Sequence, residues 1–382
     1  MMLVRVITAA VKPALLGAAI SAAAGGGYLA YDRFAPHGDV SAFQRIQGHG
    51  QRLLISEFGD TTDTIVAVEP DDIAARTTVA TIDHASGYGV FPVLSPDGQA
   101  IAYTGLPAGT AKPAPDVPAQ AAVVDVRGNV ALLANDADLL IPPVWSPDSR
   151  SIAVRRSVAA ADGSGTYELL LLGRDGTRAT LTTWRTASLF PIAFAPDGSK
   201  LYFATLSPAG TDLHSVAAGG TGEAMIAHLS DDIARDWKLS PDGATLAYSV
   251  AAGGAQPQVI TMTLDFASGV AAEAVRSPAA QRLEFNPAWE ADGTLTMASA
   301  RPEGGSSVSA VAAATAKTLA SNDGAVDLPL AWSPDGASLA VRSVEGPALA
   351  QATASHLDLL ASDGTRRRVS DSADVLIVGW LP

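Results

Sequence analysis

A short turn motif recurs six times along the chain and constrains its fold more than any other feature. It reads, with small variations, as an apolar residue followed by Ser-Pro-Asp-Gly, and its aspartates lie 43 to 51 residues apart: Asp97, Asp148, Asp197, Asp242, Asp292 and Asp335. This spacing is the length of a four-stranded propeller blade. The proline sets the backbone angle of the first central turn position, the aspartate hydrogen-bonds nearby backbone amides, and the glycine accepts a positive φ. The motif therefore predicts one hairpin turn per blade and a structural role for its aspartate.

An apolar strand follows each turn. These strands start with pairs such as Ile101-Ala102 and Leu246-Ala247 and contain little charge, as expected of strands that neighbouring blades cover on both faces. Further strands and Asp-Gly turns follow at intervals of about 8 to 12 residues, which is typical of an all-β array. We therefore expect an all-β propeller of four-stranded antiparallel blades.

A seventh blade begins before the first Ser-Pro-Asp-Gly turn. Residues 48–55 align with residues 96–103, with His49 in the place of the turn aspartate. Two segments could supply the innermost strand of this blade: residues 43–46, just before the turn, or residues 375–380, one repeat beyond Trp332. We predict the second, because a blade built from both ends of the chain closes the ring and removes its free sheet edges.

The repeated unit Pro-x-Trp-Ser-Pro-Asp-Gly-x-x-Ile-Ala-Tyr resembles the repeat of the TolB-like propellers, also called WD40-like or PD40 repeats. The resemblance covers roughly residues 46–382 and implies a β-propeller. TolB itself has six blades preceded by a small α/β domain, whereas we expect seven blades here, preceded by residues 1–31 and a linker of residues 32–45. The resemblance also implies a partner-binding role in the bacterial envelope.

Composition excludes several classes of function. The net charge of −14 and the lack of a basic stripe argue against a nucleic-acid partner. The basic run Arg366-Arg367-Arg368 is interpreted as a solvent-facing strand edge, where charge discourages aggregation. The chain has no cysteine, and its six histidines are scattered, so we expect no metal centre, no cofactor and no cysteine nucleophile. It also lacks the Gly-x-Ser-x-Gly motif of the hydrolases that share such propellers, and we expect no catalytic residues.

The N-terminus carries an export signal. Residues 13–31 contain no charge, and Arg5 and Lys12 precede them; nineteen residues approach the length of a membrane-spanning helix. Positive charge before the span places the propeller on the extracytoplasmic side. We predict a retained single-pass anchor in a bacterial inner membrane, although Ala22-Ala23-Ala24 also fits a signal-peptidase site. Gly17, Ser21 and Gly25 would give this helix a smooth packing face, a pattern that also arises by chance in so Ala- and Gly-rich a segment.

Aspartates recur in the connections that lead into each blade. These connections share one face of the disc with the loops between second and third strands. The candidate binding residues there are Asp136, Asp138, Asp231, Asp232, Asp236, Asp323, Asp327 and Asp374. Clustered carboxylates attract cations or a basic partner, but Asp is also common in the loops of any acidic protein. No metal ligand set is assigned.

Two functions follow from these observations. The first is a non-catalytic interaction scaffold or accessory subunit, held in the membrane by its N-terminal helix, with the propeller in the periplasm and a protein partner in the membrane or envelope. The second is an enzyme or small-ligand binder that uses the central channel. A purely structural subunit of a membrane assembly, held through Gly17, Ser21 and Gly25, is a third possibility.

Overall fold

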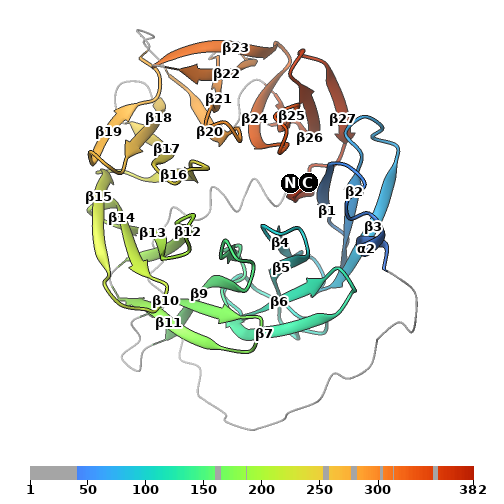
Figure 1. Ribbon diagram of the computed structural model, residues 1–382, viewed down its shortest axis with the longest axis vertical. Coiled ribbons are helices and arrows are strands. Elements are labelled where there is room, and N and C mark those ends of the chain that lie inside the picture. Colours follow the sequence, from blue (N-terminus) through green and yellow to red (C-terminus); the bar gives the residue numbers. More distant parts are fainter. Residues whose placement is uncertain are drawn as a thin grey trace.

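Seven four-stranded antiparallel sheets surround one axis in the described part of the chain (Figure 1). The computed structural model describes residues 41–159, 165–185, 187–252, 258–276, 282–301, 304–312, 314–346 and 352–382. We number the blades by sequence, starting with the one that contains β1. The seven-bladed propeller expected from the repeat is confirmed.

Each blade is a meander that runs from the axis to the rim. The innermost strands, for blades 1 to 7, are β28 (Val375–Leu381), β4 (Phe91–Leu94), β8 (Val144–Trp145), β12 (Ser188–Phe194), β16 (Ala234–Leu239), β20 (Glu284–Trp289) and β24 (Ala325–Trp332). The second strands are β1 (Arg52–Glu57), β5 (Ala100–Gly105), β9 (Ser151–Ala159), β13 (Lys200–Ser207), β17 (Thr245–Ala252), β21 (Leu295–Ala300) and β25 (Ser338–Glu345). The third strands are β2 (Thr62–Val68), β6 (Ala119–Asp125), β10 (Gly165–Gly173), β14 (Gly210–Ala217), β18 (Gln258–Asp265), β22 (Ser306–Ala312) and β26 (Ala354–Ala361). The outermost strands are β3 (Arg76–Asp83), β7 (Val130–Ala137), β11 (Arg178–Trp184), β15 (Ala224–Ser230), β19 (Val270–Glu273), β23 (Thr315–Asn322) and β27 (Arg366–Ser370).

The two ends of the described chain meet in blade 1. Strand β28 pairs antiparallel with β1, from Arg52 opposite Leu381 to Glu57 opposite Val375. The predicted closure by the C-terminal strand is therefore confirmed. The rejected candidate for this position is helical: α2 (Ala42–Arg45) is capped by Ser41, and its Phe43 is buried in the core between blades 1 and 2.

The recurrent turn works as its residue types predict. In all six turns the Asp carboxylate accepts a hydrogen bond from the backbone N–H two residues later, as Asp148 does from Arg150. Ser146 also donates to Asp148 at 2.6 Å and accepts from the N–H of Ser151. The polar groups of the turn thus satisfy one another, which confirms a structural role for these aspartates.

The tryptophan of the motif joins neighbouring blades. The indole of Trp145 donates to the backbone carbonyl of Val93 in the preceding blade at 3.0 Å, and Trp289 donates in the same way to Lys238 at 2.9 Å. The indole of Trp380 in blade 1 donates in the same way to the backbone carbonyl of Ala331 in blade 7. A buried indole N–H needs an acceptor, so the repeated tryptophan helps to fix each innermost strand against its neighbour.

The disc has two different faces. We call the side with the Ser-Pro-Asp-Gly turns and the turns between third and outermost strands the turn face. The loop face carries the connections between blades and between second and third strands, and these differ from blade to blade. The residues predicted to form the membrane anchor, including Gly17, Ser21 and Gly25, lie outside the described residues. Within the described ranges no helix is long and apolar enough to cross a bilayer.

Candidate functional site

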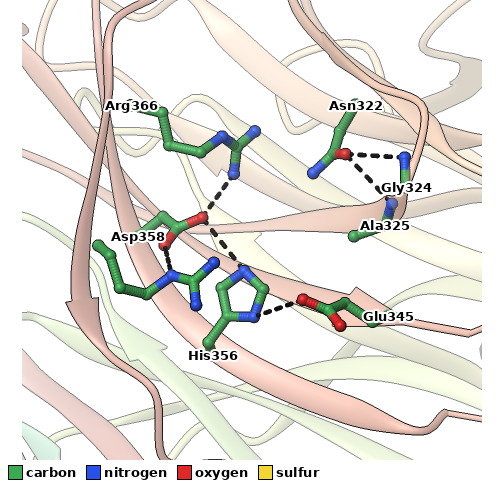
Figure 2. Close-up of a pocket in the computed structure, with 8 residues that line it drawn as sticks. Asn322, Gly324, Ala325, Glu345, His356, Asp358 and Arg366 are labelled. Carbon is green, nitrogen blue, oxygen red and sulfur yellow. Dashed lines mark hydrogen bonds and ion pairs between the residues drawn. The ribbon is translucent and has the colours of Figure 1, made fainter.

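A polar pocket opens between blades 6 and 7 at the loop-face end of their interface (Figure 2). Its volume is about 420 Å³. The side of blade 7 that faces blade 6 is apolar near the turn face, with buried Leu339 and Val341, and turns polar near the loop face. The residues that line the pocket are Asn322, Gly324, Ala325, Glu345, His356, Asp358, Arg366 and Arg368.

Two buried carboxylates form the base of this site. Asp327 and Asp358 are 1% and 0% exposed, and both accept hydrogen bonds from the guanidinium of Arg366. The Ser343 hydroxyl lies between them, at 2.6 Å from Asp327 and 3.1 Å from Asp358. Arg368 donates to the other oxygen of Asp358 at 2.7 Å. Because buried charges are costly unless paired, these ion pairs explain how the acids are accommodated.

A histidine lies between two acids on the wall of the pocket. The Nε2 atom of His356 is 3.4 Å from Asp358, and its Nδ1 atom is 3.4 Å from Glu345. His356 is 5% exposed, whereas 47% of the Glu345 side chain is accessible. Figure 2 shows Glu345 and Arg366 on opposite sides of the imidazole. The pocket therefore offers an accessible carboxylate and guanidinium donors to one small polar ligand.

The network changes the interpretation of the basic run in β27. This strand is at the rim, as expected, but the expectation of solvent-facing charges is wrong for Arg366, whose partners are the buried acids. Burial disfavours the charged form of the Arg366 guanidinium. Hydrogen bonds to Asp327 and Asp358 and their negative charge outweigh this effect, so the pKa of Arg366 is raised. Arg367 donates to the backbone carbonyl of Pro70 in blade 1 at 2.7 Å. Arg366 therefore binds acids within blade 7, and Arg367 joins blade 7 to blade 1.

The predicted acidic residues lie at the loop-face ends of several blades, but arginines form hydrogen-bonded ion pairs with four of them. Asp136 forms ion pairs with both Arg156 and Arg178. The other three pairs are Asp138 with Arg155, Asp323 with Arg301, and Asp327 with Arg366.

The remaining predicted acids differ in their surroundings. Asp231 is fully exposed and lies 3.1 Å from His228, and Asp232 is also exposed. Asp374 interacts electrostatically with Arg342. Asp236 belongs to the innermost strand β16 and forms a longer ion pair with Arg235, at 3.8 Å. The structure does not bring the eight residues together into one site, and binding of a basic partner or cation to this face remains a prediction.

The pocket residues His356 and Asp358 were not identified from the sequence. Residues two apart on a strand share a face, so the pattern His-x-Asp in β26 was a weak signal that both side chains point the same way. Their partners come from other strands: Ser343 is opposite His356, and Arg368 is opposite Asp358. Among the described residues no three His, Cys, Asp or Glu side chains are arranged to hold a metal ion.

No known protein family matches the sequence, and no curated protein matches it. Solved structures are similar in fold. A prolyl endopeptidase structure is 13% identical with a TM-score of 0.56, and the match covers 85% of this chain but only 50% of that one, so this chain spans about half its length. An oligogalacturonate lyase from Vibrio parahaemolyticus is 14% identical, with a TM-score of 0.55 over 78% of this chain and 84% of that one.

TolB from Acinetobacter baumannii is 16% identical, with a TM-score of 0.48 over 85% of this chain and 80% of that one. These are distant similarities of architecture. At such identities the prolyl endopeptidase and lyase similarities show the propeller fold alone and assign no family, because one propeller fold supports many functions.

Proposed function

We propose that the protein is a membrane-tethered, non-catalytic interaction module that presents its loop face to a protein partner on the extracytoplasmic side of a bacterial membrane. The main support for this proposal is the position at which the first described residues pack on the propeller. Ser41 donates a hydrogen bond to the carbonyl of Val126, and Gln47 donates to the carbonyl of Gly98 at 3.1 Å. Both acceptors belong to the turn face.

A tether that joins at the turn face orients the disc. The residues before Ser41 would hold this face toward the bilayer, and about ten linker residues reach at most some 35 Å. The loop face then points away from the membrane. Its connections are irregular and differ between blades, which is where binding residues are usually found on a rigid scaffold.

The loop face offers accessible groups to a partner. The side chains of Asp231 and Asp232 are exposed, and Phe58 and Ile233 are 42% and 36% exposed. An apolar residue beside exposed acids suits a basic, partly apolar protein surface. By contrast, the Ser and Asp side chains of the turn face already satisfy one another.

Site-specific photo-crosslinking in cells tests this orientation. A benzophenone amino acid at Asp232, on the loop face, should yield a crosslinked partner, whereas the same residue at Ala267, an exposed turn-face position, should not. Crosslinks from position 267 alone, or none from either position, would contradict the proposal. Membrane fractionation of the same cells should recover the protein in the pellet and protected from cytoplasmic protease.

Replacement of Asp231 and Asp232 by Asn provides the matched binding test. A basic partner should then bind more weakly and with a smaller dependence on salt. Asp327 is unsuitable for this test because it is buried and holds Arg366, so its replacement would disturb the fold.

The pocket between blades 6 and 7 favours a second candidate function, the binding of a small polar ligand. The supporting observation is the accessible Glu345 carboxylate beside His356 in a 420 Å³ pocket. A screen of small zwitterions and hydroxylated compounds by thermal shift should find ligands that stabilise the wild type and not Glu345→Gln. Glu57→Gln, whose carboxylate is comparably accessible at 40%, is the control. If a ligand stabilised both variants equally, this pocket would be excluded as its binding site.

A further inference from the structure

Unpartnered buried polar atoms concentrate in blade 5. In the described residues six buried side-chain polar atoms have no hydrogen-bond partner, and four of them belong to this blade: Trp237, Tyr248, Ser249 and Thr261. Buried polar groups are normally hydrogen-bonded, and exceptions often indicate an ion or a water. The two aliphatic hydroxyls of this set, Ser249 and Thr261, are both 0% exposed. They are on the side of blade 5 that faces blade 6.

The two hydroxyls lie next to each other. Ser249 in β17 is directly opposite Thr261 in β18, so their Cβ atoms are about 5 Å apart and both oxygens can approach one point. The backbone N–H of Thr261 donates to Glu284 of blade 6 at 2.8 Å. The Ser249 hydroxyl is close enough to the carboxylate of Asp236 to lower its pKa, but it does not reach hydrogen-bonding geometry.

The backbone beside these hydroxyls has an uncommon conformation at two residues. Asp236 has φ 58° and Asn286 has φ 50°, and each lies at a bulge of an innermost strand, β16 in blade 5 and β20 in blade 6. Positive φ is uncommon for residues other than glycine, although aspartate and asparagine tolerate it best, and such positions often occur at binding sites. The Asp236 carboxylate lies close enough to the backbone N–H of Asn286 for this group to lower its pKa. The two bulges thus turn a carboxylate toward the seam between the blades.

The two carboxylates of the seam are paired to different degrees. Glu284 is paired with Arg282 at 2.8 Å, and both side chains are buried. The nearest basic atom to Asp236 is the Nε of Arg235, 3.8 Å away on a side chain that is 44% exposed. Burial raises the pKa of the Asp236 carboxyl, while Arg235 and Lys238 lower it. Since 29% of the Asp236 side chain remains accessible, an ion from solvent can reach it.

We propose that Asp236, Ser249 and Thr261 hold a hard cation, bound through oxygen atoms in the seam between blades 5 and 6. Hard cations prefer carboxylate and neutral oxygen ligands, including Ser and Thr hydroxyls. A single carboxylate that already faces Arg235 favours a monovalent ion, sodium or potassium. The ion would also give both hydroxyls the partner that they lack. This site is independent of the loop-face function proposed above.

Cation-dependent thermal stability of the full-length protein tests the site. Melting is measured in choline chloride and, at the same ionic strength, in sodium, potassium, magnesium or calcium chloride. At a concentration ten times the dissociation constant, a bound ion should raise the melting temperature of the wild type by about 2 °C. The double variant Ser249→Ala/Thr261→Val should lose this rise. It should remain folded in choline, because replacing an unpartnered buried hydroxyl by an apolar group is nearly neutral.

Ser56→Ala is the matched control. Its hydroxyl is also buried and unpartnered, but it belongs to blade 1, so this variant should keep the full response to the cation. The proposal is overturned if none of the four ions stabilises the wild type relative to choline. It is equally overturned if the double variant responds as strongly as Ser56→Ala, because the hydroxyls would then bind only water.

Discussion

Leu381 tests whether the closing strand supports the whole ring or only its own edge. It is the last residue of β28, is 2% exposed and packs with Leu54, Ile101 and Val378 between blades 1 and 2. Replacement by Ala removes most of a buried leucine side chain and leaves a cavity, which costs about 2–5 kcal/mol. With a urea m-value of about 3 kcal/mol/M, the unfolding midpoint should fall by roughly 1 M.

Leu376→Ala is the control in the same strand. Leu376 is only partly buried, so the same substitution should cost about 1 kcal/mol. Urea unfolding followed by tryptophan fluorescence measures both variants, because the six tryptophans of the chain report on several blades. The reasoning fails if Leu381→Ala leaves the midpoint unchanged while hydrogen exchange in β28 alone accelerates. The closing strand would then open locally without unfolding the ring.

Three further predictions concern ionisable groups. Asp358→Ala should cost about 3 kcal/mol, since it leaves two arginines facing a buried gap; a loss below 1 kcal/mol in urea unfolding would show that water replaces the carboxylate. The hydrogen bond to Asp212 raises the pKa of His228. The stabilisation of the folded state by this bond is therefore fully present below the pKa of the unfolded state, near 6.5, and is lost as pH rises through the pKa of the folded state. Because 43% of that side chain is exposed, His228→Gln should cost only a few tenths of a kcal/mol at pH 5.5 and less at pH 8.5, and the opposite order would contradict this reading. The hydrogen bond from the neighbouring serine lowers the pKa of Asp148, so Asp148→Ala should cost about 0.5–1 kcal/mol at pH 7, with a penalty that vanishes as pH falls through the folded value; a pH-independent penalty would exclude the carboxylate as its cause.

The predicted turns and closure show what local chemistry can reveal. Proline, aspartate and glycine act on their own backbone within a few residues, so each turn could be predicted from the sequence alone. The closing strand could be predicted because residues 375–380 continue the same period. The helix at α2 could not, because residues 43–46 are too few for periodicity to distinguish a strand from a helical turn.

The candidate sites depended on contacts that the sequence does not specify. Asp327 was grouped with exposed loop acids, yet it is buried because residue 366, far along the chain, places a guanidinium beside it. Asp236 was grouped with the same acids, but it lies at a bulge in β16, close to the backbone of Asn286 in blade 6. Neither the pairing of charges between strands nor the direction of a bulged side chain follows from local pattern.

The sequence by itself therefore determined the repeat, the number of blades and the way in which the ring closes, since these follow from turn chemistry and strand period. Only the tertiary structure decided which polar side chains are neutralised and which lack a partner. Those outcomes depend on which strands share a blade interface and on the strand positions that bring distant residues opposite one another.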